Sequence, residues 1–190
     1  MRKRVLVVDD DQAIRDSLRK VLQGAGYEVV LAAEGLEADR RFEPDAIDLV
    51  VLDLNLPNQS GWDVFEHLTT RHPFVPILIL TGLPNQYRTA VAAGVGALLE
   101  KPVEVSALLS TMETLLAEPA EARLRRLCGE LQDTRYTPSI GAPATAHHNS
   151  VADAIIQVLR SHRTGSAAGA VKPEWGPSAA SVSPSVRSDS

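Results

Sequence analysis

Several features common in other protein classes are scarce or missing in this sequence of 190 residues. It has one cysteine, Cys128, so no disulfide can join two parts of the chain. It has no apolar run of about 20 residues, the length needed to span a membrane, and no pattern typical of a secretion signal. We therefore expect a cytoplasmic protein that does not associate with membranes.

Motifs for nucleotide binding and for DNA recognition are also missing. The sequence has no G-x-x-x-x-G-K-[ST] loop, and residues 119–163 contain no evident helix-turn-helix. Residues 1–118 carry 18 acidic and 11 basic residues, whereas residues 119–190 carry 6 acidic and 8 basic ones. Because an acidic surface repels the phosphate backbone, we do not expect direct nucleic-acid binding.

Short apolar segments alternate with stretches of helical spacing along residues 1–118. The apolar segments are too short for helices and lack polar alternation, which is typical of strands covered on both faces. They are residues 4–8, 28–32, 48–53, 76–80 and 97–99. Helical patterns follow them at residues 12–23, 34–42, 62–68, 84–93 and 103–117. This alternation predicts an α/β fold of the flavodoxin-like type, with a five-stranded, doubly wound parallel sheet.

Residues 48–53, which read Asp-Leu-Val-Val-Leu-Asp, are the predicted central strand. Asp53 stands at its C-terminal end, where open α/β sheets place their ligand sites because the loops diverge there. Pro57 and Gly61 predict a turn just beyond this strand. We therefore expect Asp53 to be presented at the edge of the sheet.

Polar residues follow the C-terminal ends of four predicted strands. They are Asp9 and Asp10, Asp53, Thr81, and Lys101. Because these ends share one edge of a parallel sheet, we expect the side chains to meet at one site. Clustered carboxylates repel one another, and a divalent cation with oxygen ligands, for which Mg²⁺ is the natural candidate, would offset that repulsion. Lys101 and Thr81 would then contact a phosphoryl group, and Asp53 would act as a nucleophile that forms an acyl phosphate.

Each of these residues also has a simpler explanation when it is considered alone. Asp10 or Asp11 could cap a helix, Thr81 could be a turn residue, and Lys101 could be a solvated charge. The occurrence of such residues at four strand ends of one sheet favours a shared site over four separate explanations.

Four short motifs occur in order along residues 3–118. They are Val7-Val8-Asp9-Asp10-Asp11, then Leu52-Asp53-Leu54-Asn55-Leu56-Pro57 with Gly61, then Leu80-Thr81-Gly82, and finally Lys101-Pro102. In order and spacing they resemble the receiver domain of two-component response regulators. The resemblance implies that residues 1–118 form a signalling domain rather than an enzyme, although one that takes part in its own phosphorylation and dephosphorylation.

The resemblance implies a role for each motif residue. Asp53 would accept a phosphoryl group from a histidine kinase or a phosphotransfer protein. Lys101 would pair with the phosphoryl oxygens, Thr81 would swing toward them, and the Lys101–Pro102 peptide bond would be cis.

The resemblance also implies a set of ligands for Mg²⁺. Asp10, Asp53 and the backbone carbonyl of Asn55 would bind the ion directly, and Asp9 would join through a water molecule. Charge neutralisation and positioning would then carry the phosphoryl transfer.

Leu98 departs from the pattern of the family, which commonly has an aromatic residue three positions before the lysine. Val103, where the family often has Phe, is a smaller change that concerns packing. Because leucine fits two orientations with little difference in buried area, we expect the face around the last strand to respond weakly to phosphorylation. Output would then rely more on the loops at residues 54–60 and 82–86.

Residues 119–163 are predicted to contain short amphipathic helices and a linker of unknown role. Residues 121–132 place Leu124, Leu127, Cys128 and Leu131 on one helical stripe. Arg123, Arg125 and Arg126 beside it are interpreted as a solvated face.

The remainder of the chain offers fewer signals. Residues 133–149 are turn-rich, and we interpret His147 and His148 as loop residues rather than metal ligands. Residues 150–159 have the pattern of a short helix that begins with a capping box. Residues 164–190 are rich in Ser, Ala, Gly and Pro and are predicted to be a disordered tail.

These patterns predict a phosphoacceptor switch that signals through contacts with an unknown downstream protein, and a phosphorylation-dependent homodimer stays open. One alternative is a DNA-binding transcription regulator whose reader lies in residues 119–163. Another is an aspartate-nucleophile phosphatase of the haloacid dehalogenase type. Those enzymes have a second Asp two residues after the nucleophile, where this chain has Asn55.

Overall fold

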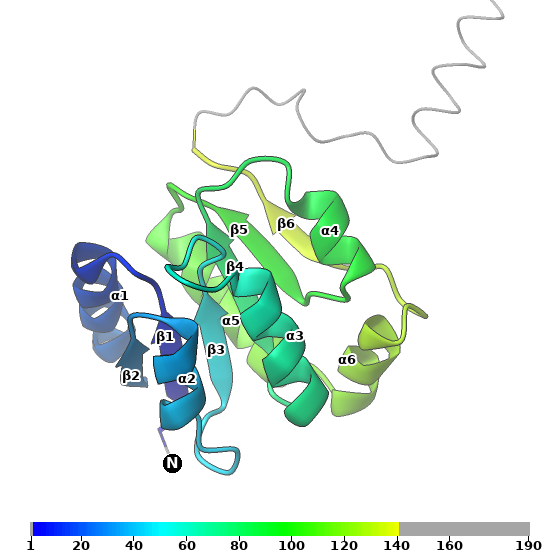
Figure 1. The fold of residues 1–190 in the computed structure, drawn as a ribbon, viewed down its shortest axis with the longest axis horizontal. Helices are drawn as coiled ribbons and strands as arrows, with labels where there is room; N and C mark the ends of the chain where they lie inside the picture. Colours follow the sequence, from blue (N-terminus) through cyan, green and yellow to red (C-terminus); the bar gives the residue numbers. More distant parts are fainter. Residues whose placement is uncertain (1, 141–190) are drawn as a thin grey trace, which may run out of the picture. The chain divides into compact units, whose positions relative to one another are not determined.

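The computed structural model describes residues 2–140, in which strands and helices alternate around a parallel sheet (Figure 1). The strand order is β2-β1-β3-β4-β5-β6. The strands are β1 (Arg4–Val8), β2 (Glu28–Ala32), β3 (Leu49–Leu52), β4 (Ile77–Thr81), β5 (Ala97–Glu100) and β6 (Arg135–Thr137). The helices are α1 (Gln12–Gly24), α2 (Gly35–Arg41), α3 (Gly61–Arg71), α4 (Tyr87–Ala92), α5 (Val105–Ala117) and α6 (Ala120–Leu127).

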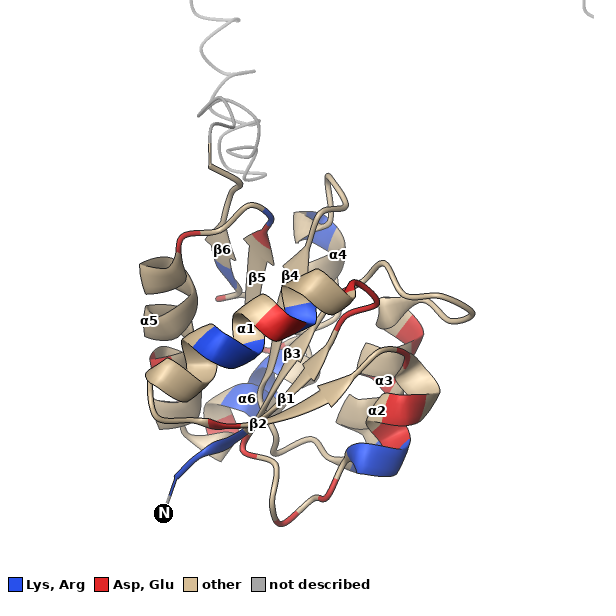
Figure 2. Ribbon diagram, turned by 90° about the vertical axis from the view of Figure 1, so that its left-hand side faces the viewer, with Lys and Arg blue, Asp and Glu red and all other residues tan. Residues whose placement is uncertain are grey.

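Helices cover both faces of the sheet, so the central strands are buried on each side. Figure 2 shows α1 and α5 on one side and α2 and α3 on the other. Phe65 and Leu98 belong to the apolar core under α2, α3 and α4, and Leu22 and Met112 belong to the core under α1 and α5. Burial on both faces explains why β3, β4 and β5 read as continuous apolar runs rather than as alternating patterns.

The sheet has one strand more than the five predicted. The additional strand, β6, falls within residues 133–149, which the sequence predicts to be turn-rich. It runs parallel to β5, with Tyr136 opposite Leu98. A strand of three residues is too short for a recognisable pattern, and β6 forms because it satisfies backbone groups along the edge of β5.

The helix predicted over residues 121–132 is shorter in the structure. Helix α6 ends at Leu127, and the chain turns away at Gly129. The φ of Gly129 is +76°, a left-handed conformation that glycine adopts without steric cost. The C-terminal part of the predicted amphipathic stripe therefore lies outside the helix.

The interpretation of the arginine cluster as a solvated face is wrong for two of its three members. Arg126 is 1% exposed and Arg123 is 8% exposed, whereas the Arg125 side chain is 58% exposed. The buried carboxylate of Glu118 pairs with both Arg123 and Arg126, and Arg126 also bonds to Asp133, with 2.7 Å between Nε and Oδ1. Buried arginines need such partners, and the local sequence pattern does not reveal them.

Three predictions concern residues outside the described part of the chain. They are the helix at residues 150–159, the loop with His147 and His148, and the tail at residues 164–190. Among residues 2–140, no helix has the length and apolar character needed to cross a membrane.

Candidate functional site

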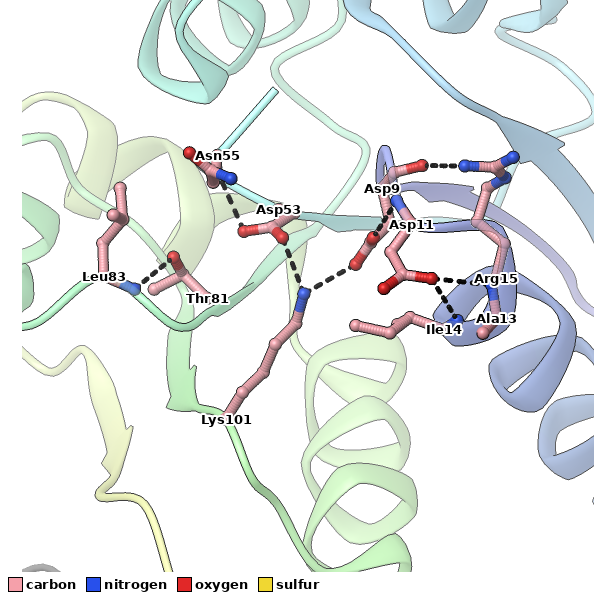
Figure 3. A network of polar contacts seen from close by, with 10 residues as sticks. All are labelled: Asp9, Asp11, Ala13, Ile14, Arg15, Asp53, Asn55, Thr81, Leu83 and Lys101. Atoms are coloured by element: carbon pink, nitrogen blue, oxygen red, sulfur yellow. Dashed lines mark hydrogen bonds and ion pairs between the residues drawn. The ribbon is translucent and has the colours of Figure 1, made fainter. Parts of the chain in front are cut away.

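The structure brings the predicted polar residues together at the C-terminal edge of the sheet (Figure 3). Asp9 follows β1, Asp53 follows β3, Thr81 ends β4 and Lys101 follows β5. Lys101 Nζ lies 2.6 Å from Asp9 Oδ2 and 2.6 Å from Asp53 Oδ2, so one ammonium group bridges two carboxylates. The parallel topology therefore gathers residues that are up to 92 positions apart in sequence.

Three acidic residues form the negatively charged part of this edge. Asp9 and Asp53 are buried, Asp10 is exposed, and carboxylate oxygens from all three lie within 4.8 Å of one another. Burial raises the pKa of Asp9, although hydrogen bonding to Lys101 opposes that shift. Three carboxylates beside one ammonium group leave an excess of negative charge, which is the environment that oxygen-ligated divalent cations prefer.

Lys101 stays charged in this partly buried position. Burial alone would lower its pKa, but the hydrogen bonds to Asp53 and Asp9 and the negative charge of the two carboxylates together raise the pKa of Lys101. The ammonium group is therefore a permanent positive charge at the site under ordinary conditions.

Both carboxylate oxygens of Asp53 are engaged. Oδ1 accepts a hydrogen bond of 3.1 Å from the backbone N–H of Asn55, and Oδ2 accepts the bond from Lys101. The backbone N–H of Asn55 thus orients the Asp53 carboxylate, and the backbone carbonyl of Asn55 takes no part in that hydrogen bond.

The loop after β1 shows which acidic residue caps α1. Asp11 is the N-cap, since its Oδ1 accepts hydrogen bonds from the N–H groups of Ala13 at 2.7 Å and Ile14 at 3.3 Å. The capping alternative is therefore correct for Asp11 and not for Asp10. Asp9 Oδ1 in turn accepts a bond of 2.9 Å from the Asp11 N–H, which fixes the course of the acidic loop.

Arg15 belongs to this site, although sequence reasoning did not single it out. Its Nη1 donates a hydrogen bond of 2.6 Å to the backbone carbonyl of Asp9. Arg15 stands four residues after the N-cap Asp11, so its side chain returns toward the start of α1. The four-residue spacing from Asp11 to Arg15 was the sequence signal for this contact. It can be interpreted only once Asp11 is known to be the N-cap of α1.

Thr81 is fully buried at the end of β4. Its Oγ1 accepts a hydrogen bond of 3.1 Å from the N–H of Leu83. In this structure Thr81 therefore makes the contact of a turn residue, which is the simpler explanation given for it above. The Lys101–Pro102 peptide bond is cis, as the resemblance implied.

Gly61 lies against the backbone of the Asp53 strand end. A Cβ at this position would overlap the carbonyl oxygen of Asp53 and the Cα of Leu54. The absence of a side chain at Gly61 thus lets α3 begin directly beside the site. Ser60, the N-cap of α3, completes a capping box with Asp63 that fixes this helix start.

We expect Gly61→Ala to lower the free energy of unfolding by about 1–3 kcal/mol, because backbone rather than a flexible side chain must shift. Urea unfolding followed by circular dichroism measures the change. Gly24→Ala is the matched control, since nothing lies within 4 Å of an added Cβ there. Equal unfolding midpoints for Gly61→Ala and the wild type would contradict the close approach.

Comparison with known families gives one match that spans more than half of the chain. Residues 5–113 match the model of the response regulator receiver domain. Among curated proteins, "Response regulator MprA" of Mycobacterium ulcerans is 39% identical over 118 residues, which are 61% of this chain and 51% of that protein. "Response regulator MprA" of Mycolicibacterium vanbaalenii is 40% identical over 115 residues, covering 60% and 50%. The chain spans about half the length of the curated relatives it matches.

Solved structures with the same arrangement include several receiver domains. A CheY-like receiver domain protein from Methanospirillum hungatei has a TM-score of 0.58 and 32% identity, and the match covers 61% of this chain and 94% of that one. The response regulator TrrA from Thermotoga maritima, solved with Mg²⁺ and BeF, has a TM-score of 0.55 and 32% identity over 60% and 98%.

Proposed function

The chain belongs to the response regulator receiver domain family, and we propose that it is a phosphoacceptor switch of a two-component phosphorelay. A histidine kinase or a phosphotransfer protein would supply the phosphoryl group, and Asp53 would accept it. The observation that carries this proposal is the position of Asp53. Its carboxylate lies at the sheet edge, bound to Lys101 and grouped with Asp9 and Asp10.

In the proposed transfer, Oδ2 of Asp53 attacks the phosphorus atom of a phosphohistidine. The P–O bond forms as the P–N bond breaks, and the leaving imidazole nitrogen takes up a proton from water. Oδ2 accepts a hydrogen bond from Lys101 in the structure, and in the proposed transfer the ammonium group turns from Oδ2 toward a phosphoryl oxygen. The N–H of Asn55 holds Oδ1 meanwhile and keeps the carboxylate oriented.

Mg²⁺ is the proposed cofactor because the residues at this edge fit it. Asp10, Asp53 and the backbone carbonyl of Asn55 would hold the ion directly, and Asp9 would hold it through water. The bound ion would neutralise charge on the carboxylates and on the incoming phosphoryl group. The complex of the Thermotoga maritima relative with Mg²⁺ and BeF supports this choice.

Thr81 and Lys101 are the proposed contacts of the phosphoryl oxygens. Lys101 would contribute its positive charge, and the Thr81 hydroxyl would exchange its contact with the Leu83 N–H for one with the phosphoryl group. Both residues stand at strand ends on the edge of the sheet that carries Asp53, and Lys101 already bonds to the Asp53 carboxylate.

The proposed organisation is a receiver domain at residues 1–118, a segment of unknown role at residues 119–163 and a tail at residues 164–190. The receiver domain would signal by binding a downstream protein. Because the chain spans about half the length of its curated relatives, we do not assign the activity of those whole proteins to it.

The alternative functions find little support. DNA binding by residues 119–163 would depend on Arg123, Arg125 and Arg126, of which Arg123 and Arg126 are buried and engaged with Glu118. Asn55 stands where a haloacid dehalogenase has its second Asp, and its backbone N–H orients Asp53. We therefore retain the phosphoacceptor as the proposal.

The test is labelling with radioactive acetyl phosphate in the presence and absence of Mg²⁺. We expect label with Mg²⁺ and none with a chelator, because a phosphoryl dianion cannot approach the carboxylates unless their charge is offset. The label should be released by hydroxylamine, as an acyl phosphate is. Equal labelling with chelator, or no labelling by either acetyl phosphate or a phosphohistidine donor, would overturn the proposal.

A further inference from the structure

Strand β6 contacts the residue that precedes Lys101. Tyr136 of β6 lies opposite Leu98, and its ring packs against Tyr87 of α4 with 5.0 Å between ring centroids. Burial and a hydrogen bond with the Glu100 side chain both raise the pKa of the Tyr136 hydroxyl. The buried carboxylate of Glu100 is therefore joined to β6.

The chain after β6 contacts the residue that follows Lys101. The N–H of Ile140 donates a hydrogen bond of 3.1 Å to the carbonyl of Pro102. Lys101 thus lies between Glu100 and Pro102, which both contact residues 135–140. Glu100 does so through its side chain and Pro102 through its backbone carbonyl. Residues 135–140 lie outside the match to the receiver family, which ends at residue 113.

Lys101 itself is held in an arrangement that changes in the proposed phosphorylation. Its backbone N–H donates to the carbonyl of Thr81 at 2.8 Å, and its Nζ bridges Asp9 and Asp53. In the proposed transfer this ammonium group turns from Asp53 Oδ2 toward a phosphoryl oxygen. Contacts that fix Glu100 and Pro102 therefore favour the arrangement without a phosphoryl group.

We propose that residues 135–140 form a strap, the β6 strap, that holds Lys101 in its bridge between Asp9 and Asp53. Phosphorylation of Asp53 loosens the β6 strap, and weakening the strap makes the phosphorylated arrangement easier to reach. The effect of phosphorylation on the strap and the effect of the strap on phosphorylation have the same coupling free energy, so each must be observed if the other is. This inference rests on the proposed phosphoacceptor function and adds a regulatory role for residues outside the receiver domain.

Tyr136→Phe tests the strap, because it removes the hydroxyl that contacts Glu100 and keeps the ring that packs on Tyr87. With Mg²⁺ and beryllofluoride as the phosphoryl mimic, we expect the dissociation constant to fall about fivefold, the low end of ordinary coupling between sites. Isothermal titration calorimetry measures it. Glu100→Gln weakens the same hydrogen bond from the other side and should shift the constant in the same direction by a smaller factor.

Tyr87→Phe is the matched control, since it removes the same atom from the neighbouring ring without touching the contact with Glu100. We expect wild-type affinity for beryllofluoride in this variant. An equal shift in both tyrosine variants would assign the effect to general loosening of the aromatic pair and would overturn the strap.

The reciprocal effect is measured in the wild-type protein. Amides that hold the strap include those of Arg135, bonded to the carbonyl of Gly96 at 3.1 Å, and Ile140. We expect beryllofluoride to speed hydrogen exchange of residues 135–140 by about fivefold, the low end of ordinary coupling, because binding that is coupled to the strap must loosen it. Binding without any change there would overturn the strap alone, whereas failure of the wild type to bind beryllofluoride would overturn the phosphoacceptor function as well.

Discussion

Replacement of Asp53 by asparagine is expected to reduce phosphoryl labelling by at least about a thousandfold, as loss of a nucleophile does in enzymes. An amide oxygen is a poor nucleophile for phosphorus, and the product would lack the acyl phosphate bond. The variant keeps the size of the side chain and an oxygen that can accept the N–H of Asn55. It loses the ion pair with Lys101, so its fold is checked by circular dichroism before labelling.

Two further variants make this result specific. Asp45→Asn removes an exposed acid before the N-terminal end of β3, whereas Asp53 follows the C-terminal end, and it should label like the wild type. Asp10→Asn removes a proposed metal ligand and keeps the nucleophile, so it should label only at higher Mg²⁺ concentration. Wild-type labelling of Asp53→Asn would show that the phosphoryl group goes elsewhere.

The site could be predicted from sequence because topology, rather than side-chain detail, brings its residues together. Asp53, Thr81 and Lys101 each follow an apolar run, and the ends of parallel strands share one edge. The contacts within the site could not be predicted in the same way. Whether Asp10 or Asp11 caps α1, and that Arg15 holds the Asp9 carbonyl, depends on the path of a short loop.

The region after α5 was less predictable for a different physical reason. Periodicity reports burial of apolar side chains, but α6 and β6 are attached largely through buried charge and backbone pairing. Arg126 is surrounded by partners from outside its own helix, so the pattern on α6 alone indicates a solvated face. Strand β6 is specified by the free edge of β5 and has no apolar pattern of its own.

Leu98 stands where the family commonly has an aromatic residue, and a segment distant in sequence changes its surroundings. The residue is fully buried, and β6 places Tyr136 directly opposite it. An aromatic ring therefore stands beside a position where the sequence indicated none. The expectation that output relies on the loops at residues 54–60 and 82–86 stays a prediction, and exchange measurements with beryllofluoride would compare those loops with residues 135–140.

Arg126 has the strongest expected effect on stability. Its side chain is fully buried and bonds to Glu118, the C-cap of α5, and to Asp133, which precedes β6. Burial alone would lower the pKa of Arg126, but the hydrogen bonds to Glu118 and Asp133 and the negative charge of these two acids together raise it. Among residues 2–140, removing the guanidinium would leave the buried Glu118 carboxylate with Arg135, at 3.6 Å, and Arg123, at 3.8 Å, as its ion-pair partners.

We therefore expect Arg126→Met to weaken the attachment of α6 and β6 by about 3–5 kcal/mol, the usual cost of removing one partner from a buried pair. Because the network joins these elements to the end of α5, the loss should appear as faster hydrogen exchange at residues 119–137 while β1 to β4 stay protected. Arg125→Met is the matched control. Its exposed pair with Glu130, at 3.2 Å, should contribute no more than about 1 kcal/mol. Equal exchange in the two variants would show that buried charge does not hold this segment on the domain.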